Sequence, residues 1–296
     1  MLSGGTETTC IRFTVAPVPT DHPAGPWCPR TIRDDATAGG VWPEGGVLYD
    51  VDGPFVAGLD AFYDDPFWKL YEDDGTVRVT DSAEACDAAA RPDVDPAYTN
   101  HCVECQTSYL DADLAVTYVL PKRPVAMPQP GRIGNPVGVA LNGIGFDPPA
   151  PTDAILGAYT LAPFDDCGGH VNPHGGYHYH AATGCGTRVA QDDGHAPQIG
   201  YALDGFPLYD PPTDSASLDE CRGHSDASRG YHYHAAEPGE NQFVGCFVGE
   251  HGCALAGDGD GQTCDATQQR GRRGPPGGPP PGGRRGDPFP TPHDHH

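Results

Sequence analysis

The chain is short of basic residues. It has 17 Lys and Arg against 41 Asp and Glu, which gives a formal net charge of −24 at pH 7. Such a surplus of negative charge repels phosphate, so the composition excludes a nucleic-acid partner and disfavours an anionic membrane surface. No run of about 18 apolar residues occurs, so we expect no transmembrane segment. The stretch Met1–Cys10 lacks the charged and apolar regions of a signal peptide, and none is visible in it.

Long helix-forming stretches are also scarce. The 41 Gly and 33 Pro make up a quarter of the 296 residues, which favours short strands and many turns. The 11 Cys are too many for a typical cytosolic chain of this size and indicate disulfides in an oxidising compartment. Their odd number leaves one unpaired, bound to a metal or bonded to another chain. We therefore expect a secreted, cell-surface or periplasmic protein.

What the sequence does contain is an 18-residue unit present twice. Residues 165–182 and 219–236 align without a gap, and 11 of the 18 positions are identical. Each copy has an acidic pair, a Cys, a Gly-His pair and then Gly-Tyr-His-Tyr-His-Ala-Ala. If the end of each unit is a strand, alternation places its two His on one face and its two Tyr on the other.

The repeat is larger than the histidine unit. Residues 136–146 form an apolar run with an Asn-Gly turn, and residues 199–209 form a similar run with Asp-Gly at the corresponding place. Each repeat is thus a hairpin, a Pro-rich loop and a Cys/His segment. We predict a mainly β fold with few short helices: a duplicated β-rich, sandwich-like module, packed face to face or in tandem and stabilised by disulfides.

The histidines are candidate metal ligands. Two imidazoles on one strand face and a third from upstream form a three-nitrogen set that suits zinc with an open fourth position, or copper. The predicted ligands are His170, His178, His180, His224, His232 and His234. They could form two separate sites or one shared dinuclear site. An alternative without metal is a polar, hydrogen-bonded strand layer or a stacked aromatic binding surface.

Neighbouring residues could support such a site. The acids Asp166 and Glu220 are candidate proton acceptors or hydrogen-bond partners of the ligands, although they could equally be surface acids beside a disulfide. The tyrosines of the repeated segments are further candidates for supporting contacts, namely Tyr177, Tyr179, Tyr231 and Tyr233. Gly169 and Gly223 are expected to adopt a backbone conformation closed to other residues.

We predict disulfides rather than thiolate ligands at the repeat cysteines. The expected pairs are Cys167 with Cys185 and Cys221 with Cys246. The single C-x2-C pair, Cys102 and Cys105, has no second pair at zinc-knuckle spacing, so we expect both to bond to other cysteines. Cys10 and Cys28 form a candidate local disulfide.

Outside the repeats, the chain reads as short strands, one helix and a tail. Strands are predicted at residues 47–50, 54–56, 67–71, 77–79 and 114–120, and a helix at 82–90 capped by Asp81. The acidic turn at 257–261 resembles part of a calcium loop but lacks its spaced carboxylates. The predicted divisions are an irregular Pro/Gly-rich segment at 1–46, a small β-rich Cys-containing region at 47–110, the repeat domain at 111–267 and a disordered tail at 268–296.

The motifs together resemble the YHYH domain family. The resemblance covers roughly residues 114–247 and includes the segments 138–143, 167–170, 200–206 and 218–221 with both Tyr-His-Tyr-His runs. It implies an extracellular compartment and a module rather than a reaction. One departure is Arg222, which stands where the first repeat has Gly168.

The function that these residues favour is binding of a transition metal, copper or zinc, outside the cell. A metal-dependent hydrolase or copper oxidase with an open three-histidine site is the enzymatic alternative, so the sequence leaves catalysis undecided. A third reading is an adhesion or matrix module without metal. Elemental analysis separates the metal readings from the third.

Overall fold

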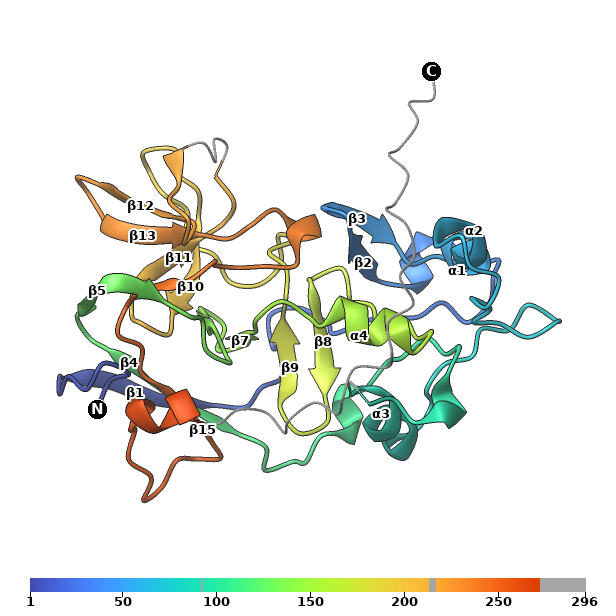
Figure 1. Cartoon of the computed structure of the whole chain (residues 1–296), viewed down its shortest axis with the longest axis horizontal. Helices are drawn as coiled ribbons and strands as arrows, with labels where there is room; N and C mark the ends of the chain where they lie inside the picture. The colour runs from blue at the N-terminus through green and yellow to red at the C-terminus, as the bar shows by residue number, and fades with distance from the viewer. Residues whose placement is uncertain (92, 213–216, 272–296) are drawn as a thin grey trace, which may run out of the picture.

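The computed structural model describes residues 1–91, 93–212 and 217–271 (Figure 1). Its largest sheet has eight strands in the order β12-β13-β11-β10-β6-β7-β9-β8. In chain order these are β6 (Gly138–Ala140), β7 (Gly145–Phe146), β8 (Gly169–Asn172), β9 (Gly176–Tyr179), β10 (Gln198–Ala202), β11 (Pro207–Tyr209), β12 (Gly223–Asp226) and β13 (Gly230–His234).

The eight strands divide into two modules of the same topology. In the first, β6 and β7 form an antiparallel hairpin, β7 pairs parallel with β9, and β9 pairs antiparallel with β8. The second repeats this arrangement with β10, β11, β13 and β12. The modules meet where β10 pairs antiparallel with β6. The mainly β, duplicated fold is therefore confirmed, and the modules lie in tandem within one sheet rather than face to face.

Three smaller sheets surround this one. β4 (Val116–Pro121), the strand predicted at 114–120, lies between β1 (Cys10–Val15) and β15 (Cys253–Ala256). The other two sheets are the pairs β2 (Val41–Glu44) with β3 (Val47–Asp50), and β5 (Ala126–Gly131) with β14 (Phe247–Gly249). The hairpin β2–β3 crosses the predicted division at residue 46, so the N-terminal segment is part of the folded body.

The helices are short, and several of them lie in the first 110 residues. The α-helices are α1 (Gly53–Ala57), α2 (Leu59–Phe62), α3 (Ala83–Ala89) and α4 (Thr152–Gly157). The 3-10 helices are η1 (Ala36–Ala38), η2 (Pro96–Tyr98), η3 (Thr107–Tyr109), η5 (Pro238–Glu240) and η6 (Ala266–Gly271). Thus residues 268–271 belong to η6, and the rest of the predicted disordered tail, 272–296, lies outside the described residues.

Four of the local predictions need correction, and the helix at 82–90 is confirmed. The helix α3 is confirmed, but Ser82 rather than Asp81 caps it, accepting a hydrogen bond from the Ala85 N–H. The predicted strand at 54–56 is wrong. Asp52 accepts from the Phe55 N–H and Pro54 occupies the first turn, so this segment is helix α1. The predicted strands at 67–71 and 77–79 are also wrong, because these stretches form only isolated bridges, Tyr71 with Val77 and Val79 with Cys102.

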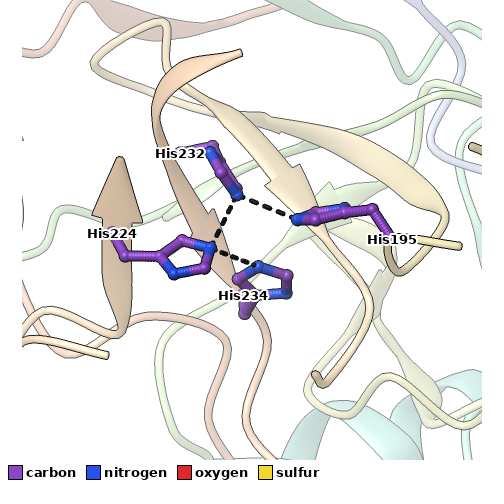
Figure 2. A group of neighbouring side chains, drawn as sticks. All are labelled: His195, His224, His232 and His234. Atoms are coloured by element: carbon purple, nitrogen blue, oxygen red, sulfur yellow. Dashed lines mark hydrogen bonds between the residues drawn. The ribbon is translucent and has the colours of Figure 1, made fainter. Parts of the chain in front are cut away.

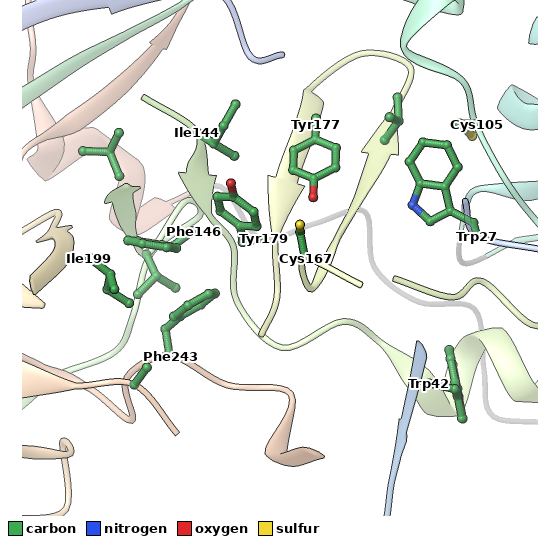
Figure 3. Close-up of a cluster of buried hydrophobic side chains, with 14 of the residues drawn as sticks. Trp27, Trp42, Cys105, Ile144, Phe146, Cys167, Tyr177, Tyr179, Ile199 and Phe243 are labelled. Atoms are coloured by element: carbon green, nitrogen blue, oxygen red, sulfur yellow. The ribbon is translucent and has the colours of Figure 1, made fainter. Parts of the chain in front are cut away.

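One hydrophobic core connects the N-terminal region to the modules. It includes the buried rings of Trp27, Trp42, Tyr177 and Phe243 (Figure 3). The Trp27 indole N–H donates to the Gly169 carbonyl at 3.0 Å, which ties the N-terminal region to β8 directly. The first 110 residues therefore form one wall of the first module.

Five disulfides stabilise the chain. Both predicted pairs in the repeats are present, Cys167–Cys185 and Cys221–Cys246. The C-x2-C cysteines bond elsewhere as predicted, in Cys28–Cys102 and Cys86–Cys105, and the fifth pair is Cys253–Cys264. The predicted Cys10–Cys28 pair is wrong, because Cys28 bonds to Cys102. Cys10 is the unpaired cysteine that the odd count required.

In the part of the chain that the structure describes, no helix has the length and apolar character needed to cross a membrane.

Candidate metal centres

The upstream histidine of each unit folds back onto its own strand. His170 on β8 lies opposite His178 on β9, and His224 on β12 lies opposite His232 on β13. Because β8–β9 and β12–β13 occupy the two ends of the eight-stranded sheet, the histidines form two clusters rather than one shared site.

The first cluster, which we call centre 1, contains His170, His178 and His180. One ring nitrogen from each lies within 4.8 Å of the others. The Nε2 atoms of His170 and His180 are 3.2 Å apart. The Nδ1 atoms of His178 and His180 face main-chain oxygens, those of Gly176 at 3.1 Å and Pro148 at 2.7 Å.

The second cluster, centre 2, contains four histidines: His195, His224, His232 and His234 (Figure 2). The Nε2 atom of His224 lies 2.9 Å from that of His232 and 3.3 Å from that of His234. The Nε2 atom of His195 lies 3.0 Å from that of His232. The sequence analysis missed His195, because it lies outside the repeated unit and has no histidine counterpart in the first module.

Hydrogen bonding fixes the ring orientation in centre 2. The Nδ1 atoms of His195 and His232 lie 2.9 and 3.0 Å from the carbonyl oxygens of Ala196 and Gly230. A carbonyl oxygen can only accept, so in each neutral ring Nδ1 holds the proton and Nε2 carries a bare lone pair. The two Nε2 atoms at 3.0 Å therefore present lone pairs to each other. A cation between them removes this repulsion.

The nitrogen spacing fits a metal ion. Ligand nitrogens at 2.0–2.1 Å from a tetrahedral zinc ion are about 3.3 Å from one another. The measured Nε2 separations of 2.9 to 3.3 Å in centre 2 and 3.2 Å in centre 1 are close to that value. Main-chain acceptors on Nδ1, here including the Asp210 carbonyl for His234 at 2.8 Å, are typical of metal-binding histidines.

Burial keeps these rings neutral. Desolvation holds the pKa of His170 and of His180 well below the ordinary value. Desolvation likewise lowers the pKa of His232, and it lowers that of His234 to about 4. Neutral imidazole is the form that binds metal, so both centres are ready to bind at neutral pH without first losing protons.

We expect the metal-free protein to lose stability as the pH falls from about 6.5 to about 4. The unfolded chain takes up a proton at His234 near its ordinary pKa, whereas the folded chain resists it down to about 4. Stability from this group is therefore present above the unfolded pKa and disappears as the pH falls through the folded one. Melting temperatures in chelator across this range measure the effect.

The variant His234→Gln is the control for this pH dependence, because Gln does not titrate. Its melting temperature should vary less steeply over the same pH range. An equal slope in the variant and the unmodified protein would contradict the assignment.

The tyrosines of the repeated segments point to the opposite side of their strands. In both modules their hydroxyl groups form hydrogen bonds with residues at corresponding positions. Tyr177 bonds to Asp165 and Tyr231 to Asp219, while Tyr179 bonds to Asn142 and Tyr233 to Asp204. These hydrogen bonds anchor the two strands that present the histidines, β9 and β13. The tyrosines support the centres through the backbone, while Asp166 and Glu220 are exposed on the surface.

The two glycines of the Gly-His pairs are required for a different reason than expected. A Cβ on Gly169 would lie 2.4 Å from the Tyr177 hydroxyl, and one on Gly223 would lie 2.1 Å from the Tyr231 hydroxyl. Neither glycine has a positive φ. Close approach of the tyrosine ring, rather than an unusual backbone conformation, therefore excludes a side chain here. Arg222, at the Gly168 position, has a φ of 67° and donates to the carbonyls of His234 and Ala235.

The positively charged side chain of Arg12 binds the acidic turn at 257–261. The Arg12 guanidinium donates to the carbonyl oxygens of Gly259 and Gln262, and Thr117 donates to that of Gly257. These oxygens are the kind that a calcium loop would use. These hydrogen bonds hold β1 and β4 against residues 257–262.

These features define a disulfide-stabilised β protein with a duplicated strand module and a histidine cluster in each copy. Residues 117–217 match the model of the family described as YHYH protein, which confirms the resemblance over this segment. The segment contains centre 1 and His195 but ends before β12. Comparison with curated proteins and with solved structures gave no match.

Proposed function

We propose that this protein binds two transition-metal ions, zinc or copper, one at each histidine centre. The observation that carries the proposal is the pair of bare Nε2 atoms of His195 and His232, 3.0 Å apart with both Nδ1 protons committed to carbonyl oxygens. Imidazole suits both ions, so the ligand set supports this pair of metals rather than calcium or magnesium.

The surroundings support metal binding over a purely structural role. A hydrogen-bonded core layer would place a donor opposite each acceptor. Here the side chains of His232 and His234 are buried, with 0% and 1% exposed, yet their Nε2 atoms face other ring nitrogens. The five disulfides are consistent with an oxidising compartment, so we further propose that the protein acts outside the cell or in the periplasm.

We expect two equivalents of zinc or copper per chain after loading and dialysis. Elemental analysis gives the stoichiometry, and calorimetric titration of each metal in turn gives the preference. The control is His174→Asn. His174 belongs to the same first repeat, but it is exposed and pairs with Asp87 at 2.8 Å, so this variant should still bind two equivalents. Less than a tenth of an equivalent in the unmodified protein, with no uptake on titration, would rule out the proposal.

A further inference from the structure

The two centres differ in what surrounds them. In the first module the position six residues after Leu141 is Asp147, whereas the position six residues after Leu203 is Tyr209. Eight residues before the same leucines stand Ile133 and His195. The first module thus has an acid in place of the tyrosine and lacks the fourth histidine.

In centre 2 these two residues pack against each other and against His232 and His234. The His195 ring packs edge-on against Tyr209 with 4.6 Å between centroids, and Tyr209 also contacts His232 at 5.0 Å. Arg229 lies over the Tyr209 ring, 5.9 Å from its centroid, and donates to Asp193 at 2.6 Å. Asp193 in turn accepts from the His195 N–H, so the loop that supplies the fourth ligand is fixed in place.

Centre 1 is open. A cavity of about 350 Å³ is lined by all three of its histidines and by none of the second centre's. Its other walls include Asp147, Trp27, Asn135, Ile155 and Asn172. This volume is within the range of small-molecule sites, about 300–1,000 Å³. The walls combine apolar side chains with polar and charged ones, among them Arg91 and Glu104.

Asp147 lies at the metal-facing side of this cavity. Its Oδ2 atom is 3.9 Å from the His178 Nε2 atom, too far for a hydrogen bond between them. The carboxylate is outside the group of three mutually close ligand atoms. It therefore lies beside the position that an ion bound by the three histidines would occupy, where it could accept a hydrogen bond from a molecule bound to that ion.

Building on the proposed function, we infer that the two metal ions have different roles. The ion in centre 2 is saturated by four histidines and is structural. The ion in centre 1 keeps a free coordination position that faces the cavity and binds a small external ligand. The ligand class is a small uncharged molecule whose metal-bound atom donates a hydrogen bond to Asp147, water being the simplest case.

The test uses the full chain loaded with two equivalents of cobalt(II), with azide as a probe of a free position. The d–d absorption should change on azide addition with a stoichiometry of one azide per two cobalt ions. His232→Ala, which damages centre 2, should keep this response, and His178→Ala should lose it. His195→Ala should leave centre 2 with the three histidines that correspond to those of centre 1, so at saturating cobalt(II) a second ion should respond to azide.

Asp147→Asn tests the role of the carboxylate. Removal of its negative charge should tighten azide binding several-fold, since the anion is then no longer repelled, while cobalt stoichiometry stays at two. Two bound cobalt ions with no azide response, or a response that survives in His178→Ala, would overturn the inference and leave the proposed function intact. Failure to bind cobalt, zinc or copper at all would overturn both.

Discussion

The double variant His178→Ala, His232→Ala is expected to lose metal at both centres and keep its fold. Each substitution removes a ligand that lies opposite another ligand on the neighbouring strand of its own module. Loss of groups that merely orient a ligand reduces metal affinity by about 10–100-fold, so loss of a ligand should cost at least about 100-fold. At a free metal concentration ten times the original Kd, occupancy should fall from about nine-tenths to below about a tenth.

The two single variants make this result specific. Each should retain one equivalent, because the centres lie at opposite ends of the sheet and share no ligand. Far-ultraviolet circular dichroism in chelator should be unchanged, since neither substitution touches a disulfide or an apolar core side chain. Two equivalents retained by the double variant would show that other residues bind the metal. Loss of both equivalents in a single variant would show that the centres are coupled.

Asp165→Ala is expected to be the most destabilising single substitution in the first module. The buried carboxylate accepts from the Tyr177 hydroxyl at 2.9 Å and from the N–H groups of Gly25, Cys167 and Gly169 at 2.9 to 3.1 Å. Alanine leaves all four donors without their acceptor inside the protein. Buried unsatisfied groups cost about 1–3 kcal/mol each, and partial relaxation reduces the sum, so we expect a loss of about 4 kcal/mol.

The second module provides a matched control for this variant. Asp219 accepts from the Tyr231 hydroxyl and from the N–H groups of Cys221 and Gly223, each at 2.9 Å, but it is exposed. Water can satisfy those donors after Asp219→Ala, so about 1 kcal/mol should be lost. The two variants should differ in melting temperature, with that of Asp165→Ala lower than that of Asp219→Ala by roughly 10 °C in a chain of this size. Equal melting temperatures would show that Asp165 is not the anchor of β9.

Period-two alternation was sufficient to predict much of the site. It placed His178 and His180 on the face opposite Tyr177 and Tyr179, and the strand geometry agrees. The repeated Leu-Asx-Gly turns likewise predicted the hairpins that join the modules. These predictions were possible because the same pattern occurs in both copies, which distinguishes it from the rest of the sequence.

What could not be predicted is what the two copies do not share. His195 has Ile133 at the corresponding position, so the repeats give no signal for it, although it completes centre 2. The cavity at centre 1 depends on walls from residues 27, 89–91 and 103–105, far from the repeats in sequence. Local patterns carry no information on such long-range contacts. Helix α1 was missed because a short apolar run fits strand and helix alike.

Contacts between residues 3–12 and residues 250–262 set an order of assembly. Ser3 donates its N–H to the His251 carbonyl at 3.0 Å, Thr6 donates to Glu250, and Arg12 reaches Gln262, while β1 and β15 flank β4. A ribosome makes residues 250–262 long after it makes residues 3–12, so the nascent chain cannot complete this sheet. Closure is thus a late, non-local step, which is the slow kind.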